Sequence, residues 1–110
     1  MFEKNVEIGY LLDFYGDLLK ENRRTALDLY YNSDMSLAEI SAELGITRQG
    51  VRDLIVRGGE ELQNLEEKLH VAEKFRKITE AADIAAGIAD NIGNAELSAR
   101  IAVIQNTIKD

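Results

Sequence analysis

With 110 residues, 45% of them hydrophobic and 30% charged, the sequence predicts a folded protein with one modest core and excludes a disordered chain. Neither a cysteine nor an apolar run of the roughly 20 residues needed to span a membrane occurs, which excludes disulfides, thiolate metal sites and a spanning helix. The net charge of −7 at pH 7 is opposite to the basic character of most proteins that bind DNA.

Two helices are predicted in the first third of the chain. The first covers residues 4–20, where apolar side chains recur at helical spacing: Ile8, Leu11, Leu12, Tyr15, Leu18 and Leu19. The second covers 23–32, with Asn22 as its N-cap and the turn residues 32–34 after it. Arg23 and Arg24 lie in its first turn, where they either contact phosphate beside a nucleic-acid site or remain solvated.

A helix-turn-helix is predicted over residues 36–57, SLAEISAELGITRQGVRDLIVR. Ser36 and Glu39 have the spacing of a capping box, and Gly45 suits the left-handed turn that ends a helix. Thr47 is a favourable N-cap for the second helix. The inward faces of the two helices are formed by apolar residues at helical spacing: Leu37, Ile40 and Leu44 in the first, Val51, Leu54 and Ile55 in the second.

The outward face of the second helix carries the candidate DNA contacts. With its apolar residues turned inward, Gln49, Arg52, Asp53 and Val56 point outward, and Arg48 and Arg57 lie at the flanks. Gln suits adenine and Arg suits guanine in the major groove, whereas a flanking Arg suits phosphate. We therefore expect base contacts from Gln49 and Arg52, and contact with either a base or a phosphate from Arg48. The alternative is the polar side of a surface helix, and Asp53 favours it because a carboxylate repels phosphate.

The charge is unevenly distributed along the chain. Residues 36–59 contain three acidic and three basic side chains and are neutral, so the remaining −7 lies outside the motif. A neutral motif in an acidic protein predicts weak and salt-sensitive DNA binding by a monomer. A second copy or a protein partner is then expected to supply the missing affinity.

The pair Gly58-Gly59 predicts either the end of the second helix or a hinge in it, which sets the expected domains at 1–59 and 60–110. Beyond it, apolar residues recur at nearly heptad spacing: Leu62, Leu65, Leu69, Ala72 and Phe75. This seam packs either on the first helices or on a second copy, and we expect a homodimer interface there.

The last 30 residues predict a helical hairpin. Residues 81–92 are small and apolar, with isoleucines four residues apart, and Gly93-Asn94 forms a turn signal. A last helix is predicted over 95–109 from four apolar residues: Leu97, Ile101, Ile104 and Ile108. The hairpin is expected to pack on its own body or on a second copy, and the pattern leaves both open.

Nothing in the sequence predicts catalysis or a cofactor. His70 is the only histidine, and no phosphate-binding loop, nucleophile elbow or metal-ligand spacing surrounds it, so we interpret it as structural. We therefore expect a protein without enzymatic activity, metal or cofactor. With no cysteine and no signal peptide apparent, a cytoplasmic location is the default expectation.

Five sequence blocks of the chain form a recognisable set: LLDFYGDLL at 11–19, R-x-x-x-L-x-L-Y-Y ending at Tyr31, S-L-x-E-I ending at Ile40, T-R-Q-G-V at 47–51 and LEEKLHVAEKF at 65–75. These blocks resemble the YlxM family of small bacterial helix-turn-helix proteins. Together they cover roughly residues 7–80, whereas 81–110 match no pattern. The part around 24–55 is also similar to the promoter-reading region 4 of sigma factors.

The resemblance implies an all-helical bundle with a sigma-like helix-turn-helix and an accessory role in the signal recognition particle pathway. The sequence departs from the family where an aromatic-Asp-Asn-Ile segment is frequent and this chain has residues 52–55, RDLI, and at Gly50, where Ala is usual. Three hypotheses follow: a DNA-binding regulator acting as a dimer, an adaptor binding the particle's RNA or GTPase, and a structural helical dimer. The DNA sequence recognised is not predicted.

Overall fold

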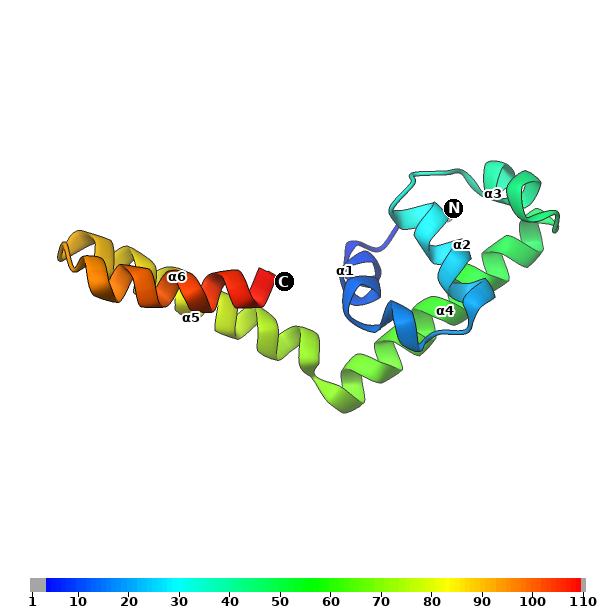
Figure 1. Cartoon of the computed structure of the whole chain (residues 1–110). Helices are drawn as coiled ribbons and strands as arrows, with labels where there is room; N and C mark the ends of the chain where they lie inside the picture. Colours follow the sequence, from blue (N-terminus) through cyan, green and yellow to red (C-terminus); the bar gives the residue numbers. More distant parts are fainter. Residues whose placement is uncertain (1–3, 110) are drawn as a thin grey trace. The chain divides into compact units, whose positions relative to one another are not determined.

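The computed structural model describes residues 4–109, which form α-helices, one short 3-10 helix and no β-strand (Figure 1). This confirms the all-α fold class. The elements are α1 (Val6–Tyr15), η1 (Gly16–Leu18), α2 (Glu21–Tyr31), α3 (Leu37–Leu44), α4 (Arg48–Leu69), α5 (Val71–Asn91) and α6 (Ala95–Lys109). They fall into two compact units that divide between His70 and Val71, here called the N-terminal unit and the hairpin unit. No helix of this described part is long and apolar enough to cross a membrane.

The first helix is shorter than the apolar pattern predicted. The Asn5 side chain caps α1 by accepting from the backbone N–H of Glu7 at 2.9 Å, and the α-helix ends at Tyr15. The chain then tightens into η1, which turns Leu18 into solvent, 61% exposed, although the stripe placed it in the core. The inward assignment of Leu18 was wrong, because a 3-10 turn does not continue the α-helical face.

The second helix begins at Glu21, before the predicted start at residue 23, and it lacks the predicted cap. Lys20 is the N-cap of α2 and makes no side-chain capping bond, while Asn22 lies inside the first turn and accepts from the Arg23 backbone N–H. The turn after α2 is confirmed, since Asp34 has a φ of 54° in the left-handed region. Leu27 and Tyr30 of α2 are buried in the core.

The glycine pair neither ends α4 nor interrupts it. The helix continues through Gly58 and Gly59 to Leu69, and both glycines are buried. A β-carbon on Gly58 would lie 2.7 Å from Cδ1 of Leu27 in α2, and one on Gly59 would lie 3.6 Å from Ile8 in α1. The pair therefore lets α1 and α2 approach α4 closely, and the end-or-hinge prediction was wrong.

Helix α4 is the axis of the N-terminal unit, and α1, α2 and α3 all pack on it (Figure 1). The core consists of aliphatic and aromatic side chains from these helices, and its largest fully buried members are Leu11, Leu27, Ile40, Val51 and Leu62. Two polar bonds tie α4 to the other helices: Tyr15 donates its hydroxyl to Glu66, and Arg23 pairs with Glu61. The expected domain boundary at 59/60 therefore lies inside a single helix.

The predicted seam from Leu62 to Phe75 is interrupted. Leu62 is completely buried in the core, and α4 ends at Leu69, because His70 adopts the left-handed conformation with a φ of 55°. Ala72 and Phe75 belong to a different helix, α5, in the other unit. The prediction of one uninterrupted heptad stripe was therefore wrong, since such a stripe requires a single helix. Contact of these five residues with a second copy stays a prediction.

The hairpin unit has the predicted form. Gly93 takes a φ of 69° after α5, and the Asn94 side chain caps α6 by accepting from the backbone N–H of Leu97 at 3.0 Å. Helices α5 and α6 lie side by side (Figure 1). The contact between them is made largely by small residues, with Ala82, Ala89 and Ile101 buried.

Candidate nucleic-acid interface

The first helix of the motif is held at its start by a complete capping box. The Ser36 hydroxyl accepts from the backbone N–H of Glu39, and the Glu39 carboxylate accepts from the backbone N–H of Ser36, both at 3.1 Å. The backbone hydrogen bond from Ser36 is the main reason that the pKa of Glu39 lies below its ordinary value. Two backbone donors that would otherwise lack partners are thus satisfied.

The turn between the two helices is tight and doubly fixed. Gly45 has a φ of 69°, the left-handed conformation that ends α3 and that a side chain would strain. The Ser41 hydroxyl donates to the carbonyl of Ile46 on the other side of the turn. The sequence analysis did not predict this bond, whose signal was a hydroxyl four residues before the glycine.

The second helix of the motif starts at the predicted place. The Thr47 side chain accepts from the backbone N–H of Gly50 at 2.9 Å and caps α4. Ile40 of α3 and Val51 and Ile55 of α4 are buried, as the helical spacing predicted. The inward faces of both helices are therefore anchored in the core, and this fixes which side of α4 points outward.

The four α4 residues predicted to contact DNA are all exposed: Arg48, Gln49, Arg52 and Arg57. Asp53 and Val56, the other outward positions, are exposed as well. Gln49 donates one amide N–H to the Asp53 carboxylate at 3.0 Å, one helical turn further along. The structure thus brings Gln49, Arg52 and Asp53 together on one accessible face at the N-terminal half of α4.

The two arginines of α2 lie in a different environment. The Arg23 guanidinium is 2.6 Å from the Glu61 carboxylate, and both side chains are partly buried. Arg24 is 3.0 Å from Asp17 and 3.9 Å from Asp28. The structure shows both arginines in ion pairs within the N-terminal unit, and the Arg24 side chain is half exposed. Phosphate contact by this pair stays a prediction.

The electrostatics of this face are close to balanced. The exposed surface of this part of α4 carries three arginines, Arg48, Arg52 and Arg57, and two carboxylates, Asp53 and Glu60. Within the part of the chain that the structure describes, no group of acidic, histidine or cysteine side chains could hold a metal ion. The face offers donors and acceptors for hydrogen bonding and a small excess of positive charge.

Comparison with known proteins places this geometry in a family. Residues 2–103 match the family described as helix-turn-helix protein, YlxM / p13 like. The chain belongs to the UPF0122 family. The family assignment agrees with the motif at 36–57 and confirms the resemblance stated from the sequence blocks. The family match extends to residue 103 in α6. It therefore includes residues 81–103, which resembled no pattern in the sequence analysis.

Individual relatives support the same assignment. A UPF0122 protein of Clostridium kluyveri is 45% identical over 78 residues, which cover 71% of this chain and 70% of the relative. A UPF0122 protein of Acetivibrio thermocellus is 51% identical over 73 residues, 66% of this chain and 62% of the relative. A UPF0122 protein of Clostridium novyi is 34% identical over 108 residues, 98% of this chain and 91% of the relative.

Proposed function

We propose that this protein is a non-enzymatic, cytoplasmic regulator that binds a specific DNA sequence in the major groove through the N-terminal half of α4. The observation that carries this proposal is the accessible face on which Gln49, Arg52 and Asp53 lie together, on a helix whose other side is anchored in the core. In a helix-turn-helix, the N-terminal residues of the second helix contact the edges of the bases. Membership of a helix-turn-helix family supports the same conclusion.

Each residue of this face has a distinct role in the proposal. The bond to Asp53 uses one N–H of the Gln49 amide, which leaves its oxygen and its second N–H for the two groups that adenine presents in the major groove. Arg52 supplies the fork of donors that suits guanine, and Arg48 and Arg57 flank it as phosphate contacts. Asp53 therefore orients Gln49 and, where it reaches the base pairs, accepts from a cytosine amino group.

The affinity of one copy is expected to be low. The proposed face has three cationic side chains with which to contact phosphate, and the whole chain carries a charge of −7 that repels DNA. Two copies bound to adjacent half-sites double the number of favourable contacts, as in other helix-turn-helix dimers. A homodimer is therefore part of the proposal.

The proposal is tested by selection from a random duplex DNA library with the full chain at about 50 mM salt, where phosphate contacts are strong. Sequencing the retained DNA is expected to show enrichment of one motif containing adenine and guanine at fixed positions. An absence of enrichment over several rounds would show that α4 does not read base sequence.

A second candidate function is that of an adaptor in the signal recognition particle pathway, which the resemblance to the YlxM family implies. The observation that favours it is the distribution of charge, since residues 1–70 contain fourteen acidic and eight basic side chains, a net of −6. Such a surface suits a basic protein better than DNA. Binding of the full chain to the particle's isolated GTPase and to its RNA distinguishes the two candidates, because the adaptor alone requires salt-sensitive binding to one of them.

A further inference from the structure

The hairpin unit has an apolar seam, a polar edge and an apolar edge, and the seam between its helices is made of small residues. Ala82 and Ala89 are seven residues apart on α5 and are buried together with Ile101 of α6. Alanines at this spacing let two helices approach closely. Apart from Ile101, several larger apolar side chains of both helices remain exposed outside this seam.

The polar edge of the hairpin is defined by two hydrogen bonds. Ser98 donates to Asp90, and Gln105 donates to Asp83, both at 2.8 Å. Asp83 and Asp90 are seven residues apart on α5, and Ser98 and Gln105 are seven apart on α6, so both bonds lie along the same edge. Helices α5 and α6 are therefore joined by polar bonds on one side of the alanine seam.

The opposite edge is apolar and exposed. At 100° per residue, Ile88 lies about 160° around α5 from Asp90, and Ile104 lies about 120° around α6 from Ser98. Ile84, Ile88 and Ile92 are 58–65% exposed, and Leu97 and Ile104 are 41% and 50% exposed. These five residues, here called the isoleucine stripe, run over both helices of the hairpin on the side away from the polar edge.

We propose that the isoleucine stripe is the surface through which two copies of this chain associate, hairpin against hairpin, as a four-helix bundle. This inference deepens the proposed function, because it names the surface that joins the two DNA-reading motifs. It also differs from the predicted seam, whose first member, Leu62, is buried within its own chain. We infer that the partner is a second copy from two properties: the charge of the hairpin and the apolar area of the isoleucine stripe.

The charge of the hairpin suits contact with a copy of itself. Residues 71–110 contain six acidic and five basic side chains, a net of −1, whereas residues 1–70 carry −6. In a two-fold interface every charge near the axis faces its own counterpart, so a neutral centre is required. Asp90 lies on the polar edge, whereas Arg100 lies between Leu97 and Ile104 on α6, and Glu96 lies one turn before Arg100, so the two charges beside the stripe have opposite signs.

The apolar area of the stripe also suits the centre of an interface between copies. Complete burial of one aliphatic side chain removes on the order of 100 Å² of apolar surface from water, so the stripe offers about 300 Å² per copy. A stable interface buries about 800 Å² per partner, of which the central part is mainly apolar and the rim polar. The stripe therefore supplies the apolar centre, with neighbouring alanines and polar side chains as the rim.

The test is sedimentation of the full chain at micromolar concentration. We expect the unaltered chain to be a dimer, and we expect the double variant Ile88→Asp, Ile104→Asp to be monomeric because its dissociation constant rises roughly a hundredfold or more. Ala99→Asp is the matched control, since Ala99 is exposed on α6 and lies about 140° around the helix from Ile104, and it should remain dimeric. Both substitutions alter exposed side chains, and circular dichroism checks that the helices persist.

A second measurement does not depend on weakening the dimer. The sequence has no cysteine, so Ile88→Cys and, as the control, Ala99→Cys each introduce a single thiol. Under mild oxidation the first is expected to form a disulfide between copies much faster than the second. A monomeric unaltered chain would overturn the proposal and would mean that the stripe is covered by the N-terminal unit or by another protein. A dimer that survives the double Asp variant would overturn it as well.

Discussion

Gly58 shows how much a single missing side chain can matter in this fold. The sequence analysis interpreted the glycine pair as a helix end or a hinge because glycine usually weakens a helix. In the structure, the chain accepts that cost in helix propensity at Gly58 because α2 lies so close that Leu27 occupies the space of a β-carbon. A close approach between helices distant in sequence leaves no local signal, which is why the pattern alone could not distinguish it from a helix end.

Substitution of this glycine is expected to destabilise the protein although it favours the helix. In Gly58→Ala the new methyl group would lie 2.7 Å from the fully buried Leu27, so we expect a net loss of about 1–2 kcal/mol in the free energy of unfolding. Gly87→Ala in α5 is the control, because nothing lies within 4 Å of its β-carbon position, and we expect a gain of about 0.5–1 kcal/mol. Urea unfolding measures both, and a stabilised Gly58→Ala would contradict the close packing of α2 on α4.

The capping box predicts a dependence of stability on pH. The hydrogen bonds from Ser36 lower the pKa of Glu39 in the folded state, so its contribution is complete above the ordinary carboxyl pKa and is lost as the pH falls through the lowered value. Glu39→Gln keeps an acceptor for the Ser36 N–H but does not titrate. Thermal unfolding from pH 7 downward is expected to show a smaller loss of stability for this variant; identical pH profiles would argue against the bond.

At the scale of elements, the sequence predicted helices reliably where a cap and an apolar stripe agreed. Ser36, Thr47 and Gly45 fixed α3 and the start of α4, and the Gly93-Asn94 turn fixed α6. It failed where tertiary packing decides the outcome: the 3-10 turn after Tyr15, the continuous passage of α4 through its glycines, and the break at His70. The exposed face of α4 followed directly from the apolar periodicity, whereas the ion pairs of Arg23 and Arg24 did not, because their partners are brought together by the fold.

The ion pairs of α2 give a prediction that separates structural from DNA-binding arginines. Arg23→Ala leaves Glu61 partly buried without its partner, so we expect a loss of about 1 kcal/mol in the free energy of unfolding after allowance for solvent screening. Arg24→Ala is the control, since its pairs are more exposed, and we expect a loss below about 0.5 kcal/mol. Neither change should alter which DNA motif is selected, and an altered motif in either variant would return α2 to the interface.

At the scale of the whole molecule, an acidic protein is proposed to bind an acidic polymer through a small neutral motif. Binding must then depend on a few local contacts and on their duplication in a dimer rather than on a general positive charge. In this proposal the N-terminal unit supplies the DNA-contacting face of α4, and the hairpin unit supplies the isoleucine stripe, so each compact unit has its own function.

This division predicts how salt affects binding. Each copy has two or three arginines able to reach DNA, so the logarithm of affinity should fall with the logarithm of salt with a slope of about −2 to −3 for one copy and about twice that for a dimer. Affinity titrations from 50 to 200 mM salt with the unaltered chain and with Ile88→Asp, Ile104→Asp measure this ratio. Equal slopes for the two proteins would show that one copy binds alone.

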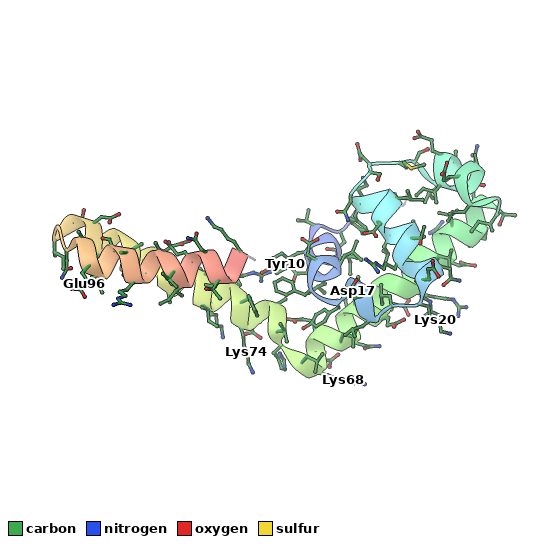
Figure 2. All side chains as sticks on the ribbon, in the orientation of Figure 1. Tyr10, Asp17, Lys20, Lys68, Lys74 and Glu96 are labelled. Carbon is green, nitrogen blue, oxygen red and sulfur yellow. The ribbon has the colours of Figure 1, made fainter. Side chains whose placement is uncertain are left out.

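The measurement that tests the central claim most directly is discrimination between the selected duplex and a scrambled duplex of the same composition, followed by fluorescence anisotropy. The double variant Gln49→Ala, Arg52→Ala is compared with the control Gln63→Ala, Lys68→Ala, which also removes one amide and one cationic side chain from α4. Lys68 lies near the C-terminal end of α4 (Figure 2), and the helical rise places it about 24 Å along the helix from Arg52. We predict that the first variant loses at least about tenfold in discrimination and that the second keeps it. Undiminished discrimination by the Gln49, Arg52 variant would contradict the account.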